Sequence, residues 1–140
     1  MLSHVTVGTN DLERARGYYD ALLPVLGFVR LHHDEQYIGY SRGIGDDGRP
    51  IKPMFWVCLP FDGAPATVGN GVHIAFMADS RSDVARFYQA GLELGGRDEG
   101  PPGLRPHYHE SYYGAYFRDL DGNKLQVCCH RAEPPSGADA

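Results

Sequence analysis

The feature that most constrains the fold is an internal repeat with an offset of 69 residues. The first copy begins HVTVGTND at His4 and runs into LERARGYYDALL. The second begins HIAFMADS at His73 and runs into RSDVARFYQAGLEL. Few residues are identical, but the strand, the helix start, the helix and the closing glycine keep their places. Chance similarity of two strand–helix units is the alternative; duplication predicts that each half has a strand, a helix and then several more strands.

The segments that follow the two first strands carry the signals of amphipathic helices. In the first segment apolar residues recur at spacings of three and four: Leu12, Ala15, Tyr19, Leu22, Leu23 and Leu26. Asn10 with Glu13 predicts a capping-box-like start, and Pro24 predicts that the helix ends or kinks just before it. The second helix is expected to start near Ser80 and to end before Gly95. We interpret both apolar stripes as faces that pack on the core.

Further strands are predicted from runs rich in β-branched and aromatic residues that lie between turn signals. These runs are Phe28–His32, Gln36–Ser41, Met54–Leu59, Tyr112–Arg118 and Lys124–His130. The segment Asp119–Asn123 predicts a hairpin turn, because Asp-Gly and Gly-Asn tolerate positive φ. Residues 43–53 and 60–71 are predicted to be loops.

Charge and cysteine content limit the classes of partner. The net charge of −5 and the pI near 5.7 argue against a surface for nucleic acid or anionic membranes. We find no signal peptide and no hydrophobic run near the length of a membrane span. The three cysteines, Cys58, Cys128 and Cys129, lack a C-x-x-C pattern and favour free thiols. We therefore expect a cytoplasmic protein.

Alternation along the strands predicts which polar side chains share a face. In HVTV the valines lie on one face and His4 on the other; in VHIAF the residues Val72, Ile74 and Phe76 lie opposite His73. In KLQVCC the aliphatic residues lie opposite Gln126. If the aliphatic faces pack on the helices, then His4, His73 and Gln126 project from the other side of the sheet. Three polar residues in rows of small or polar neighbours suggest a cavity.

The stretch RPHYHESYYG, residues 105–114, follows a Gly/Pro run at 100–103 that cannot be helical. In extended chain, His107 and His109 point to the same side. Such a pair can bind a metal, donate to an anion or shuttle protons, or it can be part of a polar loop. Arg105 at the start of the stretch is a candidate anion clamp.

Three segments resemble the vicinal oxygen chelate superfamily, which includes glyoxalase I, bleomycin-resistance proteins and extradiol dioxygenases. They are HVTVGTNDLERARGYYDALLPVLGF, GVHIAF and YYGAYFRDLDGNKLQV, and the resemblance covers about residues 3–130. It implies an α+β fold of two βαβββ modules, residues 1–66 and 71–131, whose curved mixed sheets form a cup within one domain, 1–131. It also implies a homodimer. Residues 132–140, which are small, polar and Pro-rich, are expected to form a disordered tail.

The resemblance implies a divalent metal, with Zn, Ni, Mn and Fe as candidates, bound by His4, His73 and Gln126. Two departures from the family pattern bear on this site. Members with this last-strand motif usually carry Glu where this chain has Gln126, and PMFWVCLPF (53–61) contains no carboxylate. Two imidazoles and an amide leave the charge of a divalent ion unbalanced. A standard glyoxalase I or extradiol dioxygenase is therefore not expected.

Two hypotheses of function follow. In the first, the chain is a metal-assisted lyase, isomerase or oxygenase that acts on a small substrate, and the third metal ligand comes from Gln126 or from the loop with His107 and His109. The catalytic candidates are His107, His109 and Tyr113, and the cofactor-binding candidates are Arg105 and Trp56. In the second, it is a metal-free binding protein that sequesters an aromatic drug or metabolite, as bleomycin-resistance relatives do. The missing carboxylate favours the second hypothesis, and so do the aromatic residues Trp56, Tyr108, Tyr112 and Tyr113. Metal analysis of the purified protein distinguishes the two.

Overall fold

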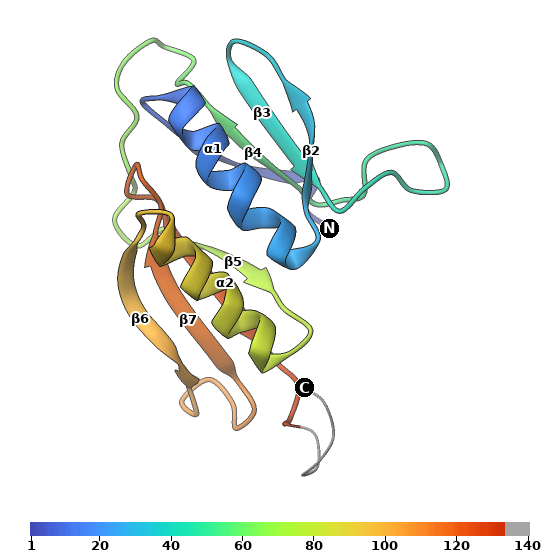
Figure 1. Ribbon diagram of the computed structural model, residues 1–140, viewed down its shortest axis with the longest axis vertical. Helices are drawn as coiled ribbons and strands as arrows, with labels where there is room; N and C mark the ends of the chain where they lie inside the picture. The colour runs from blue at the N-terminus through green and yellow to red at the C-terminus, as the bar shows by residue number, and fades with distance from the viewer. Residues whose placement is uncertain (134–140) are drawn as a thin grey trace. The chain divides into compact units, whose positions relative to one another are not determined.

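The computed structural model describes residues 1–133 of the 140-residue chain. They form two compact units, Met1–Asn70 and the residues from Gly71 onward, each with one helix across one face of a sheet (Figure 1). All but the first two residues of the predicted disordered tail, 132–140, lie outside the described residues. No helix among the described residues has both the length and the apolar character needed to cross a membrane.

The two units have the same order of elements. The first contains β1 (His4–Gly8), α1 (Leu12–Leu22), the 3-10 helix η1 (Leu23–Leu26), β2 (Val29–His33), β3 (Tyr37–Ser41) and β4 (Met54–Cys58). The second contains β5 (Ile74–Met77), α2 (Arg81–Glu93), β6 (Arg97–Leu104), β7 (Tyr113–Arg118) and β8 (Lys124–Cys129). The strand orders are β1-β4-β3-β2 and β5-β8-β7-β6. The parallel pairs are β1 with β4 and β5 with β8. The predicted α+β fold of two βαβββ modules is confirmed.

The helix boundaries follow the local signals, with one correction. The N-cap of α1 is Asp11, whose Oδ1 accepts from the N–H of Arg14 at 3.0 Å, and not Asn10 as predicted. Asp11 is the cap because it is the last extended residue before the helix. The Asn10 side chain instead accepts a hydrogen bond from the N–H of Ala66 at 2.7 Å. Ser80 caps α2 as predicted. α1 ends at Leu22, just before Pro24, as expected.

Strand β6 was not predicted, because its sequence RDEGPPGL contains two prolines and no alternation of apolar residues. It lies at the edge of its sheet and pairs only with β7, with register shifts at Gly100. Proline is tolerated at an edge, since one side of the strand needs no N–H donor. The remaining strand predictions are correct to within one residue at each end.

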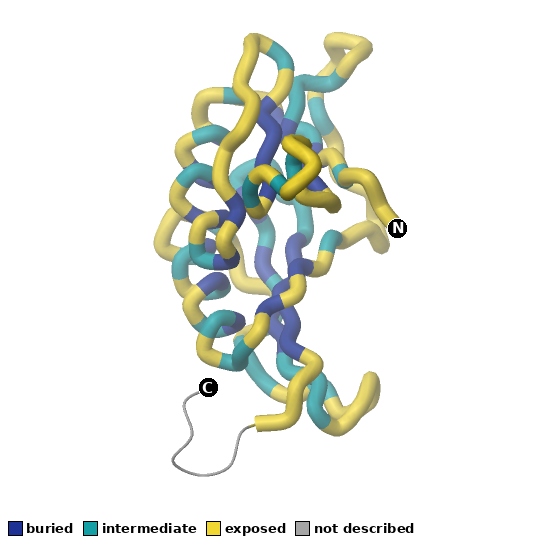
Figure 2. Tube along the Cα trace, turned by 90° about the vertical axis from the view of Figure 1, so that its right-hand side faces the viewer, coloured by how far each residue is buried: buried dark blue, intermediate teal, exposed yellow. Residues whose placement is uncertain are grey.

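Aromatic residues fill the space between each helix and its sheet. In the first unit the ring of Tyr19 on α1 lies 5.1 Å from that of Phe55 and 6.3 Å from that of Tyr40, and all three are buried. In the second unit the ring of Phe87 packs on Phe76 and Phe117. Figure 2 shows the buried segments in dark blue along the strands. These contacts identify the helix-facing side of each sheet, and the opposite side is called here the open face.

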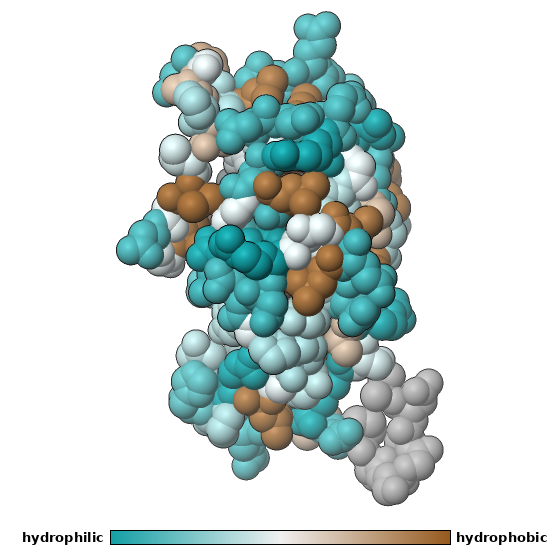
Figure 3. Space-filling view, turned by 60° about the vertical axis from the view of Figure 1, so that its left-hand side comes forward, coloured by the Kyte–Doolittle hydropathy of each residue, from teal (hydrophilic) through white to brown (hydrophobic). Residues whose placement is uncertain are grey.

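The surface shown in Figure 3 carries hydrophobic residues in several separate groups among hydrophilic ones. The most exposed large apolar side chain besides Met1 is Phe61, at 96% exposure among the described residues. Separate groups of this kind are normal on globular proteins and do not by themselves indicate a partner.

Candidate functional site

The open face of the first unit carries a hollow of about 390 Å³. Register explains its composition, because residues paired across neighbouring strands share a face: β1 pairs with β4 so that His4 lies opposite Met54 and Thr6 lies opposite Trp56. The lining residues are His4, Thr6, His32, Tyr37, Lys52, Met54 and Trp56. As predicted from alternation, His4 and Thr6 are exposed while Val7 is buried.

Trp56 is the largest group of this hollow, and Gly39 makes its position possible. Gly39 on β3 is the register partner of Trp56, and a Cβ added at Gly39 would lie 2.7 Å from the indole Cη2 and Cζ3. Two further rings surround the indole: His32 at 5.4 Å and Tyr37, edge-on, at 6.3 Å between centroids. Because Gly39 has no side chain, the indole lies against β3, with His32 and Tyr37 as its aromatic neighbours.

Of the polar groups at the margin of this hollow, the two histidines lie next to polar side chains and Lys52 carries a positive charge. His32 Nε2 lies 2.6 Å from Asp34 Oδ2, and this hydrogen bond, followed by two backbone N–H donors, lowers the pKa of Asp34 to about 2. His4 Nδ1 lies 3.0 Å from Ser3 Oγ. Lys52 takes part in none of the ion pairs formed within residues 1–133 and is the cation of the lining.

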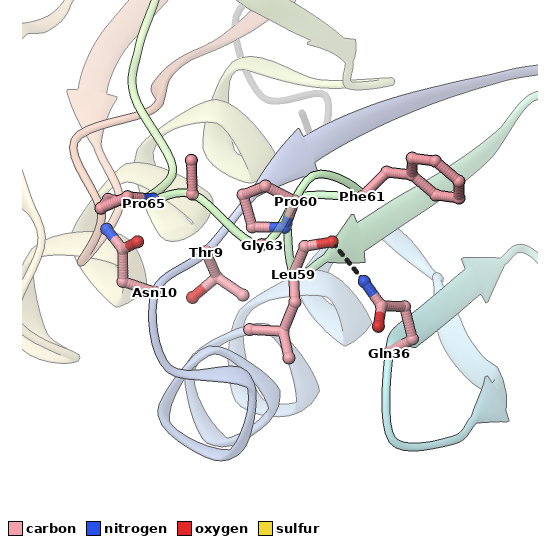
Figure 4. Close-up of a pocket in the computed structure, with 9 residues that line it drawn as sticks. Thr9, Asn10, Gln36, Leu59, Pro60, Phe61, Gly63 and Pro65 are labelled. Atoms are coloured by element: carbon pink, nitrogen blue, oxygen red, sulfur yellow. Dashed lines mark hydrogen bonds between the residues drawn. The ribbon is translucent and has the colours of Figure 1, made fainter.

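A second hollow of the first unit, of about 370 Å³, lies between the start of α1 and the loop after β4 (Figure 4). Its polar side chains are occupied by backbone partners: Gln36 Nε2 donates to the carbonyl of Leu59 at 2.7 Å, and Asn10 binds Ala66. Phe61 points away from the hollow in this view. We do not include it in the candidate site, since no polar group is directed into it without a partner.

On the open face of the second unit, hydrogen bonds join Gln126 to the RPHYHESYYG loop. Gln126 Nε2 donates to the hydroxyl of Tyr112, and Gln126 is only 2% exposed. Cys128 Sγ lies 3.6 Å from His130 Nε2, and His130 Nδ1 lies 3.0 Å from His109 Nε2. The loop therefore packs the rings of His109 and Tyr112 on His130 at the end of β8.

The backbone fixes the tautomers in this chain of groups. The N–H of Ser111 donates to His109 Nδ1 at 3.2 Å, so a neutral His109 carries its proton on Nε2 and donates it to His130 Nδ1. A neutral His130 then carries its proton on Nε2, directed at Cys128 Sγ. Burial raises the pKa of the Cys128 thiol, with the hydrogen bond from Tyr112 opposing it, so the thiol is protonated at neutral pH. None of the three cysteines forms a disulfide.

Tyr116 lies at the centre of this face, on β7 opposite Gln126. The Arg105 guanidinium lies 5.8 Å from its ring centroid, the Lys124 ammonium 5.2 Å and the His73 ring 5.8 Å. Burial, and then a hydrogen bond with Tyr108, raises the pKa of Tyr116 well above its usual range. The phenol is therefore protonated and can donate a hydrogen bond at any physiological pH.

The structure separates some of the predicted site residues. Tyr113 lies on the helix-facing side of β7, where the Arg81 guanidinium of α2 covers its ring at 5.2 Å, because neighbours along a strand point to opposite faces. It is thus apart from Gln126. His107 lies in the exposed loop with its ring tilted against that of Tyr108, at 4.2 Å between centroids. The hydrogen bonds of His109 within residues 1–133 are with His130 and Ser111 and not with His107.

His73 differs slightly from its expected place. β5 begins at Ile74, so His73 lies one residue before the strand, and Val72, expected on the helix-facing side, is 62% exposed. Alternation does not extend to residues that precede the strand. His73 still reaches the open face, where it meets Tyr116.

Sequence reasoning missed several residues of the two open faces. Alternation could have identified His130, which continues the series Gln126, Cys128 at period two. His32 and Lys52 gave no such signal, because a bulge in β2 and a loop before β4 set their positions.

The three predicted metal ligands do not fit a divalent ion well. The described residues contain no group of three or more His, Cys, Asp or Glu side chains that could hold a metal. The amide nitrogen of Gln126 donates to Tyr112, and an amide with two imidazoles contributes no negative charge. The donor set thus lacks the anion that a tight divalent site requires.

Comparison with known proteins identifies the family. The family model described as "Glyoxalase/Bleomycin resistance protein/Dioxygenase superfamily" matches residues 1–127. A glyoxalase/bleomycin resistance protein from Albidiferax ferrireducens T118 has a similar crystal structure: TM-score 0.79, 37% identity, 94% of this chain and 99% of that chain covered. No curated protein matches the sequence.

Two more distant structures share the fold. A lactoylglutathione lyase from Agrobacterium tumefaciens is 19% identical, with a TM-score of 0.63 and 92% of each chain covered. The fosfomycin resistance protein FosX from Mesorhizobium loti is also 19% identical, with a TM-score of 0.62 and coverage of 97% of this chain and 94% of its own. With the family match over residues 1–127 and the two βαβββ units, this chain belongs to the glyoxalase/bleomycin resistance protein/dioxygenase superfamily.

Proposed function

We propose that this chain binds a small planar aromatic molecule that carries an anionic group, on the open face of its first unit. The observation that carries the proposal is the indole of Trp56, which lies on Gly39 with His32 and Tyr37 around it, beside a hollow of about 390 Å³. Ligand pockets are commonly about 300–1,000 Å³ in volume and lined by aromatic side chains with a few polar groups.

The side chains of the hollow supply both parts of this recognition. A ligand ring that stacks on the indole gains roughly 0.5–1.5 kcal/mol per aromatic contact beyond the effect of burial. Lys52 gives a charge-assisted contact to a carboxylate, sulfonate or phosphate on that ring. The neutral donor set of His4, His73 and Gln126 favours binding without a metal, as in the second of the two hypotheses.

A metal-assisted lyase, isomerase or oxygenase is the second candidate. It is supported by the equivalence of His4 and His73 under the 69-residue offset and by the place of Gln126 on the open face of β8. In that case those three residues would bind the ion, which would polarise neighbouring oxygens of the substrate. Metal content and metal titration of the His4→Ala variant test this candidate.

The test of the first proposal uses Trp56, the only tryptophan of the chain, as its own probe. We expect 2-naphthoate to change the indole fluorescence saturably. We expect cyclohexanecarboxylate, which has the same charge but no aromatic ring, to bind at least about tenfold more weakly, since each lost stacking contact costs on the order of 1 kcal/mol. Calorimetry provides a second readout that does not depend on fluorescence.

Two variants separate the roles of ring and charge. Lys52→Gln should weaken 2-naphthoate but leave neutral 2-naphthamide unchanged, whereas Arg49→Gln, on the same loop but outside the lining, should affect neither ligand. Equal binding of the aromatic and saturated acids, or equal effects of the two charge variants, would reject the proposal.

A further inference from the structure

Two cations converge on one tyrosine ring on the open face of the second unit. The guanidinium carbon of Arg105 and the Nζ of Lys124 lie 5.8 and 5.2 Å from the ring centroid of Tyr116. The two side chains come from the two strands that flank β7: Arg105 follows β6, and Lys124 begins β8. Their meeting point is therefore set by the sheet and not by sequence proximity.

The Gly/Pro run before Arg105 seats its guanidinium. Nη2 donates to the carbonyl of Pro101 at 2.9 Å and Nη1 to that of Leu104 at 3.4 Å. A Cβ at Gly103 would lie 3.1 Å from Nη1, and one at Gly100 would lie 3.4 Å from Nη2. The guanidinium thus lies over two residues without side chains, held by two of its five N–H groups.

Neither cation is neutralised by a carboxylate. Within residues 1–133, no ion pair includes Arg105 or Lys124. The pKa of Glu99 is lowered mainly by Arg118 and less by the charge of Lys124, and the Glu99 carboxylate pairs with the Nε of Arg118. Two like charges held near one ring repel each other, in a chain whose net charge is −5. Other arginines of the chain, such as Arg16 and Arg30, pair with carboxylates.

Hydroxyl groups complete the donor set. The hydroxyl of Tyr116 belongs to the ring that both cations approach, and it adds a neutral O–H donor. Gly100 and Gly103 of β6 and Gly114 of β7 carry no side chain, and Arg105, Tyr116 and Tyr112 lie where a Cβ at these positions would point. Two cations without a carboxylate partner and a phenolic O–H donor on one face suit an oxyanion and no cation.

We propose that Arg105, Lys124 and Tyr116 form an oxyanion-binding site for the carboxylate or phosphoryl group of a small molecule. This site lies on the second unit and is independent of the aromatic hollow of the first. Arg105 is the directional member, because a guanidinium binds two oxygens of one anion side by side, whereas Lys124 adds a point charge. The Gly/Pro run before Arg105 then serves to hold its guanidinium in place for the anion.

The probe is inorganic phosphate, titrated into the ¹⁵N-labelled full-length protein at constant ionic strength and followed by amide chemical shifts. We expect saturable shifts that centre on Gly103, Tyr116 and Lys124. Arg105→Gln should weaken phosphate roughly tenfold or more, and Tyr116→Phe by a smaller factor. Arg105→Lys, which keeps the charge but loses the fork, should fall between wild type and Arg105→Gln.

Arg97→Gln is the matched control, because Arg97 begins β6, the strand that Arg105 follows, and is exposed with Glu99 as its ion-pair partner. It should leave phosphate affinity unchanged. The parallel titration with acetate tells which oxyanion the site prefers, since a phosphoryl site binds phosphate more tightly and a carboxylate site binds acetate at least as well.

Three results would overturn the proposal. They are shifts from both anions that do not saturate, shifts that leave the amides around Tyr116 unmoved, and an Arg97→Gln effect as large as that of Arg105→Gln. The amide spectrum of each variant also reports its fold, and Lys124→Gln offers a second route if an Arg105 variant unfolds. Loss of aromatic binding by the first unit would leave this site unaffected, so the two proposals fail separately.

Discussion

Replacement of Gly39 by alanine provides a direct test of how Trp56 is placed. The new Cβ would lie 2.7 Å from two atoms of the indole and 3.0 Å from a third, and Gly39 is buried in the middle of β3. Real Cβ contacts are not that short, so either the rigid indole or the strand must move. The φ of Gly39 is not positive, and the steric contact is therefore the only local obstacle.

The expected magnitude combines two opposing effects. Extra volume in a well-packed site costs typically about 1–3 kcal/mol. Replacing glycine in a strand recovers roughly 0.5–1 kcal/mol of backbone entropy. The unfolding free energy of Gly39→Ala should therefore fall by about 0–2.5 kcal/mol, which for a chain of this length corresponds to a decrease in Tm of at most about 10 °C.

Gly17→Ala is the matched control, because Gly17 lies on exposed α1 and a Cβ there would meet nothing within 4 Å. It should gain about 0.5–1 kcal/mol. Urea unfolding measures both changes, and the emission maximum of Trp56 should shift in Gly39→Ala only. Equal stabilisation by both substitutions, with unchanged emission, would refute the placement of Trp56 on Gly39.

The remaining predictions concern pH, packing, assembly and metal. The pKa of Asp34 is lowered to about 2 by its hydrogen bond with His32, so the stability that it adds is present above its ordinary pKa near 3.8 and is lost as the pH falls toward 2. Urea unfolding of Asp34→Asn should show a smaller decrease over that interval, and an unchanged decrease would contradict this. Gly91→Ala, whose Cβ would lie 2.4 Å from the ring of Phe117, should destabilise the protein by about 1–3 kcal/mol in the same assay; a neutral result would mean that α2 shifts freely. Light scattering should give about twice the chain mass of 15.5 kDa, and a monomer at micromolar concentration would count against the homodimer. Elemental analysis of untreated protein should find less than one metal ion per chain, and tight stoichiometric metal would show that the neutral donor set has been undervalued.

Much of the fold could be predicted because its signals are local. The caps at the helix starts and Pro24 each act within a few residues of their own position, and the 69-residue offset shows the same local signals a second time. Strand β6 escaped because its prolines and glycines suit an edge strand only when a neighbour is present to pair with it. The N-cap error at Asn10 is of the same kind, since its side chain is occupied by Ala66, 56 positions away.

The candidate site was predictable in direction but not in content. Alternation indicated the open faces and placed His4 and Gln126 on them, because side chains of a strand alternate whatever the tertiary context. With the pairing of β7 and β8 known, alternation would also have placed Tyr113 on the other face of the sheet from Gln126. The aromatic hollow depends on His32 and Lys52, whose positions come from a bulge and a loop.

The sequence by itself determined the repeat, the period of every element except β6, the helix limits to within a residue and the membership of a superfamily, because these depend on the order of neighbouring residues. Only the tertiary structure decided that Trp56 lies on Gly39 and that Arg105 and Lys124 meet at Tyr116. Each of these meetings is set by which strands pair: β3 with β4, and β7 with its two neighbours β6 and β8. A shift of register by one residue would turn every side chain of the strand to the other face, and no local pattern reports which register the sheet adopts.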